Sequence, residues 1–342
     1  MKKSLIALAV ASALTVPAIA SADATLYGAV AVDGVFKNDT SADIQVDDAV
    51  IGLKGDVDLG MDGVTGFFNI RTELAAEGAA SSGGKSLTTD RALVGIKGGF
   101  GVIQGGAMGN PVDAVESLDR AYDSYSTDNW FLNPDDLQSA LAYVSPNMGG
   151  FTGYAGIVMD GGIEDGTTGL NGTAATTSGN DEDLDGYLLG FNYAIGGFTA
   201  DVGYWDFDAE STVGAGLSGG LAQSDVDYLG VSLDYAINSN WSVTANWAER
   251  DVKNSANDLK TELWGLGTSY TMGKTVLGLT YVDFDAELNG VKTNASGDEW
   301  ALLATHNLSN RAKVYAAYSD ADVDAGTVAG DSVLTVGYGL SF

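Results

Sequence analysis

One long polar stretch of the chain gathers side chains that could act on charged solutes. It runs from about residue 110 to 138 and has one basic residue, Arg120, among many carboxylates. Its acidic residues are Asp113, Glu116, Asp119, Asp123, Asp128, Asp135 and Asp136. A loop of this charge, held inside a low-dielectric wall, focuses its field into a pore and favours cations. The alternative is a solvated surface loop whose carboxylates only aid solubility.

Residues for bond-making chemistry are few. The chain has no cysteine and a single histidine, His306, with no nucleophile motif around it. A nucleophilic mechanism needs a nucleophile, a histidine and an orienting group that converge. Residues 181–186 match the start of a calcium loop, but position twelve would be Asn192 instead of a glutamate. We therefore predict no catalytic residue, no enzymatic activity, no dedicated metal site and no cofactor.

A second acidic pattern recurs at the ends of candidate strands. The sequence of 206–210 repeats at 283–287, and Asp320, Asp322 and Asp324 close a third segment in a similar way. Carboxylates spaced by two residues share one face of a strand, where they could hold a hard cation. One interpretation is that these carboxylates form an extracellular rim that binds a structural Ca²⁺ or Mg²⁺, which would bridge to lipopolysaccharide phosphates. A generic acidic surface is the alternative.

The elements that would position these residues are short segments with a period of two. In the last one, 333–342, Leu334, Val336 and Tyr338 share one face, and small or polar residues share the other. We count sixteen such segments, each near the roughly 9–11 residues that a tilted strand needs to cross a bilayer. They are 24–36, 49–59, 64–76, 88–100, 101–109, 139–146, 151–159, 184–195, 198–207, 227–237, 241–250, 259–271, 275–284, 299–307, 313–319 and 333–342.

The connections alternate between short turns and longer polar loops, and aromatic residues gather at the ends of the segments. Outer-membrane barrels show this alternation, with short periplasmic turns, long extracellular loops and aromatic girdles at both interfaces. A soluble sandwich or barrel with one buried face is the alternative. Such a core does not usually collect tryptophan and tyrosine at both ends of so many strands.

Residues 1–22 have the features of a secretory signal. Lys2 and Lys3 precede an apolar run and a small-residue cleavage site, with a cut after Ala22 or, alternatively, after Ala20. This leaves 23–342 as one β-barrel domain. Removing the two lysines changes the net charge from −30 to −32. Nucleic acid is not an expected partner, because contact with phosphates needs a basic patch.

Several motifs, taken in order, resemble the general trimeric porins of Gram-negative outer membranes over nearly the whole mature chain. They are Leu26-Tyr27-Gly28, Ile51-Gly52-Leu53-Lys54-Gly55, 94–101, Tyr143-x-Ser145-Pro146, and the terminal Phe342. The resemblance implies an all-β fold, a sixteen-stranded antiparallel transmembrane β-barrel that crosses the outer membrane many times. It also implies a homotrimer, and a third long loop, at about 110–138, that folds inward and narrows the lumen.

The chain departs from such porins on the wall that faces this loop. Many of them carry a basic ladder there, whereas this chain has Ala29, Val50 and Asp90 at or nearest three of its positions. We therefore expect a net-negative constriction with a preference for cations. The residues that we predict for the constriction are Asp113, Glu116, Asp119, Arg120 and Asp123, and those for the pore wall are Arg71, Lys54 and Asp90.

The sequence predicts an outer-membrane porin, a passive diffusion channel for small hydrophilic solutes and ions. Its expected partners are outer-membrane lipid, lipopolysaccharide and the other copies of a homotrimer. A substrate-selective channel is the nearest alternative function. An outer-membrane barrel enzyme that acts on lipids or peptides is a further one, for which His306 would have to be catalytic.

Overall fold

A computed structural model describes most of the chain after residue 22. The described residues are 23–38, 41–75, 86–118, 136–159, 163–164, 184, 186–209, 224–254, 256–293, 296–323 and 332–342. The predicted signal peptide lies outside them, as do most of the long connections. No helix among these residues is long and apolar enough to cross a membrane.

The described chain forms eighteen β-strands and a short 3-10 helix, η2 (Pro111–Val115). Two strands, β8 (Ile163–Glu164) and β15 (Val291–Lys292), have only two residues each. The other sixteen are β1 (Asp23–Lys37), β2 (Asp43–Met61), β3 (Val64–Ala75), β4 (Ser86–Gly98), β5 (Gly101–Gly109), β6 (Asp136–Val144), β7 (Phe151–Val158), β9 (Gly186–Ile195), β10 (Phe198–Ala209), β11 (Ser224–Ala236), β12 (Trp241–Lys253), β13 (Asp258–Met272), β14 (Thr275–Leu288), β16 (Gly297–Ser309), β17 (Ala312–Val323) and β18 (Ser332–Ser341).

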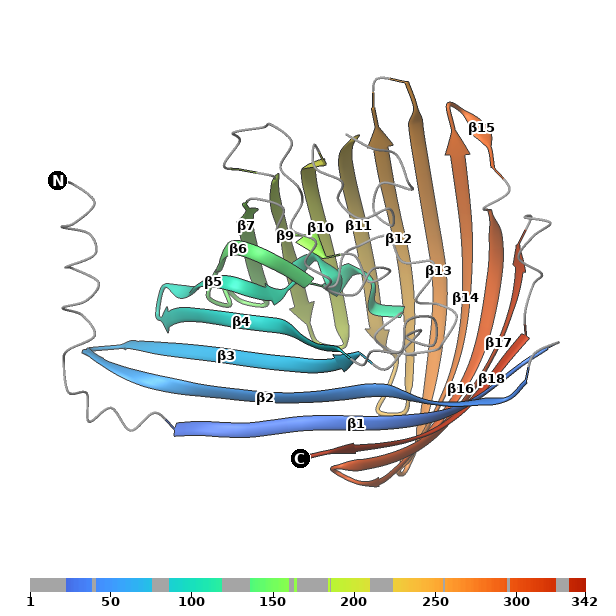
Figure 1. The fold of residues 1–342 in the computed structure, drawn as a ribbon, viewed down its shortest axis with the longest axis horizontal. Helices are drawn as coiled ribbons and strands as arrows, with labels where there is room; N and C mark the ends of the chain where they lie inside the picture. Colours follow the sequence, from blue (N-terminus) through green and yellow to red (C-terminus); the bar gives the residue numbers. More distant parts are fainter. Residues whose placement is uncertain are drawn as a thin grey trace.

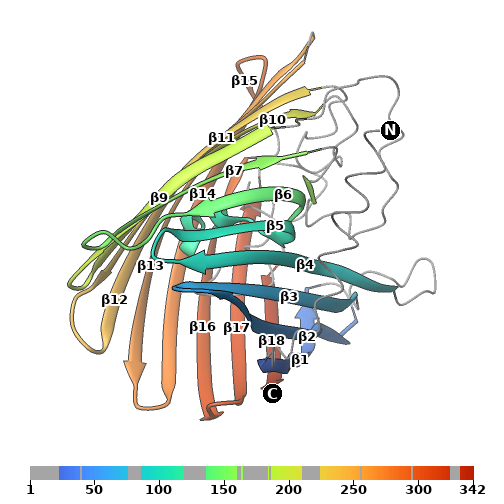
Figure 2. The same ribbon diagram turned by 90° about the vertical axis from the view of Figure 1, so that its left-hand side faces the viewer.

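The strands form one antiparallel sheet that closes on itself. Each long strand pairs with its neighbours in sequence, and β18 returns to pair with β1 from Ala29–Ser341 to Lys37–Val333. Figures 1 and 2 show the tilted strands running around the ring, with the C-terminus beside β1. The predicted sixteen-stranded barrel is thereby confirmed, and ring closure leaves no edge strand unpaired.

Several strands are longer than predicted. β2 has 19 residues where 49–59 was expected, and β14 has 14 where 275–284 was expected. The main extensions, 43–48 in β2 and 285–288 in β14, lie beyond the segments of strict alternation. There both faces of a strand meet water, so the ladder continues while the apolar pattern that marks a lipid-facing strand is lost.

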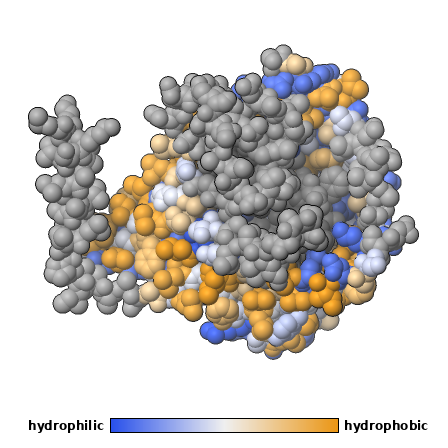
Figure 3. Space-filling view, in the orientation of Figure 1, coloured by the Kyte–Doolittle hydropathy of each residue, from blue (hydrophilic) through white to orange (hydrophobic). Residues whose placement is uncertain are grey.

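Side chains alternate between an outward face and a lumen face. In β18, Leu334 and Val336 are 40% and 49% exposed, whereas Val333 and Thr335 are 6% and 3% exposed. β11 and β12 follow the same rule, which confirms the predicted alternation. Figure 3 shows hydrophobic residues gathered in broad patches on the described outer surface. Such a surface fits acyl chains and not water.

The outward face also carries aromatic pairs. Neighbouring strands bring Trp264 and Tyr281 to a centroid separation of 5.4 Å, and Trp241 and Tyr270 to 4.9 Å. Tryptophan and tyrosine favour the boundary between hydrocarbon and headgroups, because their rings have an apolar body and a polar tip. The outer wall is therefore built for a bilayer.

Candidate functional site

The first residues after β5 fold onto the inner face of the wall. The side chain of Asn110 accepts a hydrogen bond of 3.0 Å from the N–H of Val112, and Pro111 takes the first helical position. The helix η2 that follows contacts β9, β10 and β11, and its Val112 and Val115 are almost fully buried. The start of the predicted constriction loop is thus fixed against the barrel wall.

Three glycines of the wall permit this close approach. They lie on β10, β11 and β13, at positions where a side chain would point into the lumen. A Cβ atom at each would lie 2.5 or 2.6 Å from a side chain of the loop, so a larger residue would displace the loop. The pairs are Gly203 with Val112, Gly230 with Val115, and Gly265 with Leu118.

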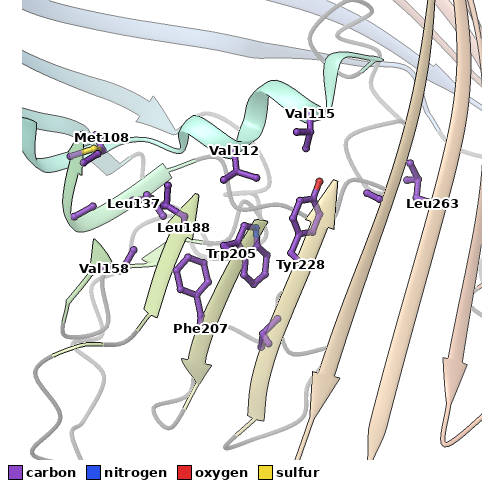
Figure 4. Packing of buried hydrophobic residues seen from close by; sticks show 14 of the residues in the cluster. Met108, Val112, Val115, Leu137, Val158, Leu188, Trp205, Phe207, Tyr228 and Leu263 are labelled. Carbon is purple, nitrogen blue, oxygen red and sulfur yellow. The ribbon is translucent and has the colours of Figure 1, made fainter. Parts of the chain in front are cut away.

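Aromatic side chains of β10 and β11 form an apolar cluster beneath the loop (Figure 4). Trp205 stacks on Phe207 with centroids 4.6 Å apart and on Tyr228 with centroids 5.2 Å apart. All three rings are 0–1% exposed. Val112 and Val115 cover the lumen side of the cluster, so this part of the inner wall is a packed core and not a water-filled surface.

Hydrogen bonds add to this anchoring. The Tyr228 hydroxyl donates to Glu116 Oε1 over 2.9 Å, and Ser117 and Ser232 share a bond of 2.5 Å between their hydroxyls. The side-chain amide of Asn246 donates to the carbonyl of Val115. The loop start is therefore held by both apolar contacts and polar bonds, which together fix its register on the wall.

The predicted constriction residues fall into two groups. Asp113 and Glu116 belong to the anchored segment, and Glu116 is only 2% exposed. Its carboxylate holds Tyr228, so its visible role is to position the loop. Asp119, Arg120 and Asp123 lie outside the described residues. Their part in an eyelet, and the narrowing of the lumen by residues 119–135, stay predictions.

The predicted wall residues lie on the lumen face of β2, β3 and β4. The guanidinium of Arg71 forms an ion pair with Asp90, whose side chain is 4% exposed. Lys54 Nζ lies 4.9 Å from the centroid of the Tyr27 ring, a cation–π contact. The charge of Arg71 is therefore largely offset by a carboxylate on its own wall.

Three further basic residues, which the sequence analysis did not select, also face the lumen. Arg91 and the preceding Asp90 both face inward. The β3–β4 register shifts between Arg71 and Thr72, and this bulge turns two successive side chains to the lumen. Lys97 pairs with Asp56 at 2.8 Å, and Lys313 lies 5.0 Å from the centroid of the Tyr315 ring. A bulge breaks period-two counting, so parity alone could not find Arg91.

Arg91 lies at the base of the long loop and contacts both of its ends. Its Nη2 is 3.5 Å from Asp136 Oδ1, at the start of β6, and the guanidinium packs where a Cβ of Gly109, at the end of β5, would be. Within the described part of the chain, Arg91 Nε and Asp90 Oδ1 are buried without a hydrogen-bond partner.

Carboxylates occupy the facing wall. Asp201 on β10 accepts a bond of 2.9 Å from Asn192, and Asp234 on β11 accepts bonds of 2.5 Å from Thr244 and 3.3 Å from Ser232. The ring order places β10 eight strand-to-strand steps from β1 in either direction. Basic residues of β2–β4 and β17 thus face acidic residues of β10 and β11 across the barrel.

The described residues show no catalytic arrangement around His306. Its ring lies on the outward face near a short turn, and Nδ1 shares a hydrogen bond of 2.9 Å with the hydroxyl of Thr275. No group of three or more His, Cys, Asp or Glu side chains that could hold a metal occurs in the described parts of the chain. Two of the rim carboxylates have other partners: Asp285 pairs with Lys292 at 2.7 Å, and Asp320 accepts from Ser332.

Comparison with known proteins identifies the family. A model of the Gram-negative porins matches residues 7–326. The chain belongs to this family. It is accordingly a multi-pass protein of the outer membrane and a member of a channel family, not of an enzyme family.

Individual relatives of this porin are distant. The major outer membrane protein P.IB of Neisseria gonorrhoeae is 29% identical over 218 residues, which cover 58% of this chain and 56% of that protein. The chain therefore aligns with little more than half the length of this relative. Porin-like protein H of Photobacterium profundum is 24% identical over 344 residues, or 95% of this chain and 96% of the relative.

Solved structures share the fold of this porin. An anion-selective porin from Comamonas acidovorans has a TM-score of 0.71 at 20% identity, with 94% of this chain and 100% of that chain covered. OmpT of Vibrio cholerae, in its trimer form, has a TM-score of 0.70 at 16% identity, with 94% and 99% covered. At such identities the likeness concerns the barrel, and solute selection must be argued from this chain's own residues.

Proposed function

We propose that this porin is a passive diffusion channel for small hydrophilic solutes and ions, with a preference for cations. The observation that carries the proposal is a closed ring of strands whose outward face is apolar and whose lumen face is lined with charged and polar groups. Such a wall lets water and solutes cross a bilayer without contact with lipid. Size and charge selection then follow from the lining side chains and the loop that rests on them.

The expected sign of the selectivity follows from how the lumen charges are neutralised. Three basic residues of the β3–β4 wall region, Arg71, Arg91 and Lys97, each pair with a carboxylate at the same wall. By contrast, neutral amide and hydroxyl groups donate to Asp201 and Asp234 on the facing wall. Neutral donors stabilise a carboxylate without cancelling its charge, so the acids keep more influence on a passing ion than the paired bases do.

Planar-bilayer recordings test this function directly. Purified protein should insert in discrete conductance steps, and a KCl gradient should give a reversal potential of the sign that cation preference requires. Liposome swelling should proceed with small sugars and stop with larger ones. Absence of conductance steps would remove the channel proposal, whereas a reversal potential of the opposite sign would remove only the cation preference.

A substrate-selective channel is the second candidate. The partly exposed guanidinium of Arg91, on the lumen wall at the base of the long loop, is a charged group that a bound solute could engage. A selective channel would show saturable block of conductance by one solute. A diffusion channel would show conductance that rises in proportion to solute concentration.

The arrangement of aromatic residues supports assembly through one side of the barrel. Outward tyrosines and tryptophans occur on strands from β6 to β18, whereas in β1–β5 the only residue of either type is Tyr27, which faces the lumen. The outer face of β1–β5 is instead aliphatic, with Ile51, Ile70 and Val94 exposed by 51%, 49% and 67%. Because tyrosine and tryptophan mark contact with a lipid interface, we infer that β1–β5 face the other subunits of a homotrimer.

Lipid-borne quenchers can locate this interface. The chain has no cysteine, so Val94→Cys and Leu266→Cys each accept a single fluorescent label. In vesicles with brominated acyl chains, a label at 266, on β13, should be strongly quenched, and a label at 94 should be protected. Equal quenching at both positions, in protein that migrates as a trimer, would contradict this choice of interface.

A further inference from the structure

A small basic cavity lies on the lumen side of the barrel, at the end that carries the short turns. Its volume is about 230 Å³, and it lies where β17, β18 and β1 meet the turn between β16 and β17. The lining residues are Ala29, Val30, Ala31, Asn307, Ser309, Asn310, Arg311, Ala312, Lys313, Gly339, Leu340 and Ser341. In outer-membrane barrels the end with short turns is the periplasmic one.

The strand register places two basic residues next to each other on the wall of this cavity, and Lys313 Nζ lies over the Tyr315 ring. Lys313, Gly339 and Ala31 form one row across β17, β18 and β1, with Gly339 paired to both neighbours. Arg311 lies next to Ser341, whose N–H donates to the Arg311 carbonyl over 2.9 Å. Residues two apart on one face of a strand are about 7 Å apart, a distance that a single oxyanion can bridge with two long side chains.

Small residues of the wall let the Lys313 side chain lie close against it. A Cβ atom at Gly339 would lie 3.2 Å from Lys313 Cε and 3.9 Å from the Ala31 side chain, so a larger residue here would displace the Lys313 side chain. Ala29, which pairs with Ser341, is equally small. The hydroxyls of Ser309 and Ser341 and the amides of Asn307 and Asn310 add hydrogen-bond donors around the hollow.

The charge of this cavity is unusual for the chain. The sequence has 46 acidic and 16 basic residues, yet no Asp or Glu is among the residues that line the cavity. Arg311 makes no ion pair within the part of the chain that the structure describes. Asp33, further along the same wall, accepts a hydrogen bond from the Tyr315 hydroxyl.

We propose that Arg311 and Lys313 form a binding site for a small oxyanion, such as phosphate or a carboxylate, at the periplasmic mouth of this porin. The cations, the surrounding donors and the small floor supply charge, hydrogen bonds and room for a tetrahedral or planar anion. In a lumen with acidic residues on the facing wall, this site would hold anions at one mouth only. The channel would then respond differently to anions added from its two sides.

Direct binding of inorganic phosphate to the detergent-solubilised protein tests the site without any need for conduction. We expect saturable binding by calorimetry at fixed ionic strength, and anomalous scattering from selenate soaked into crystals at this cavity. Each of Arg311→Gln and Lys313→Gln removes one charge-assisted contact and should weaken phosphate binding by about tenfold or more. Gly339→Val should weaken binding by displacing the Lys313 side chain, with no change in charge.

Lys274→Gln is the matched control. Lys274 lies at a neighbouring short turn, where Nζ donates to the Leu308 carbonyl over 3.1 Å, and it does not line the cavity. Phosphate affinity should be unchanged in this variant. In bilayers, phosphate on the short-turn side should lower the current of the unmodified porin more than phosphate on the other side. No saturable binding, or binding that survives both charge-removing variants, would overturn the proposal and leave the diffusion function unaffected.

Discussion

The hydroxyl of Tyr228 donates a 2.9 Å hydrogen bond to the carboxylate of Glu116, and both side chains are nearly inaccessible to water. The bond joins β11 to the segment that follows η2. It gives a carboxylate of the predicted constriction a defined partner on the wall. Burial of a carboxylate is costly unless it accepts hydrogen bonds, and the Tyr228 hydroxyl supplies one.

Tyr228→Phe should therefore loosen the loop without disturbing the aromatic stack. The substitution keeps the ring on Trp205 and removes only the donor, which leaves a buried carboxylate short of one hydrogen bond at a cost of about 1–3 kcal/mol. We expect greater open-channel noise in bilayer recordings and a lower temperature for loss of the folded band on gels. Tyr187→Phe, whose exposed hydroxyl donates to Asp206, is the control and should change neither.

Gly230→Val should push the start of the loop away from the wall and into the lumen. A Cβ at this position would lie 2.5 Å from Val115 Cγ2 and 2.7 Å from the Tyr228 hydroxyl, so the loop must move to accept it. A narrower passage should lower the single-channel conductance. Gly105→Ala meets nothing closer than 3.5 Å and serves as the control. Unchanged conductance in the first variant would mean that the loop start does not limit the pore.

The outward faces of the strands could be predicted well from the sequence. In β11, β12 and β18, lipid on one side and water on the other impose a strict alternation, and the predicted and observed faces agree. The alternation of short and long connections and the resemblance to porins predicted a closed barrel. The ends of strands such as β2 were not foreseen, because the pattern fades where both faces meet water.

The lumen face was harder to predict, for two physical reasons. Trp205 and Phe207 belong to an apolar patch that the loop covers, and alternation cannot distinguish such a patch from a lipid-facing one. The bulge at Asp90 and Arg91 turns two successive residues inward, so counting by twos selects one and loses the other. In both cases the direction or burial of the side chain depends on contacts between segments that are distant in sequence, which a local pattern does not show.

Chelation tests the predicted divalent bridge at the extracellular rim. If Ca²⁺ or Mg²⁺ links Asp283 and Asp285 to lipopolysaccharide phosphates, EDTA should release lipopolysaccharide from the purified protein and lower its thermal stability. Asp285→Asn should reproduce part of this loss, although Asp285 also pairs with Lys292 at 2.7 Å. Lys292→Gln separates the ion pair from a metal effect. Lipopolysaccharide content that does not change with EDTA would exclude the bridge.

Ion selectivity should depend on the two facing walls in opposite directions. Asp234→Asn removes a lumen charge but keeps a group that can bond to Thr244, so we expect weaker cation preference with little loss of stability. Lys54→Gln removes a cation from β2, on the opposite wall, and should strengthen cation preference. Asp283→Asn, on the outward face, is the control and should leave the reversal potential unchanged.

Because exposed charges are screened, both shifts in reversal potential should shrink as KCl is raised from about 0.1 M, where the Debye length is about 10 Å, to about 1 M, where it is about 3 Å. Shifts of the same sign in the two lumen variants would show that the facing walls do not act as opposed charges on the permeating ion.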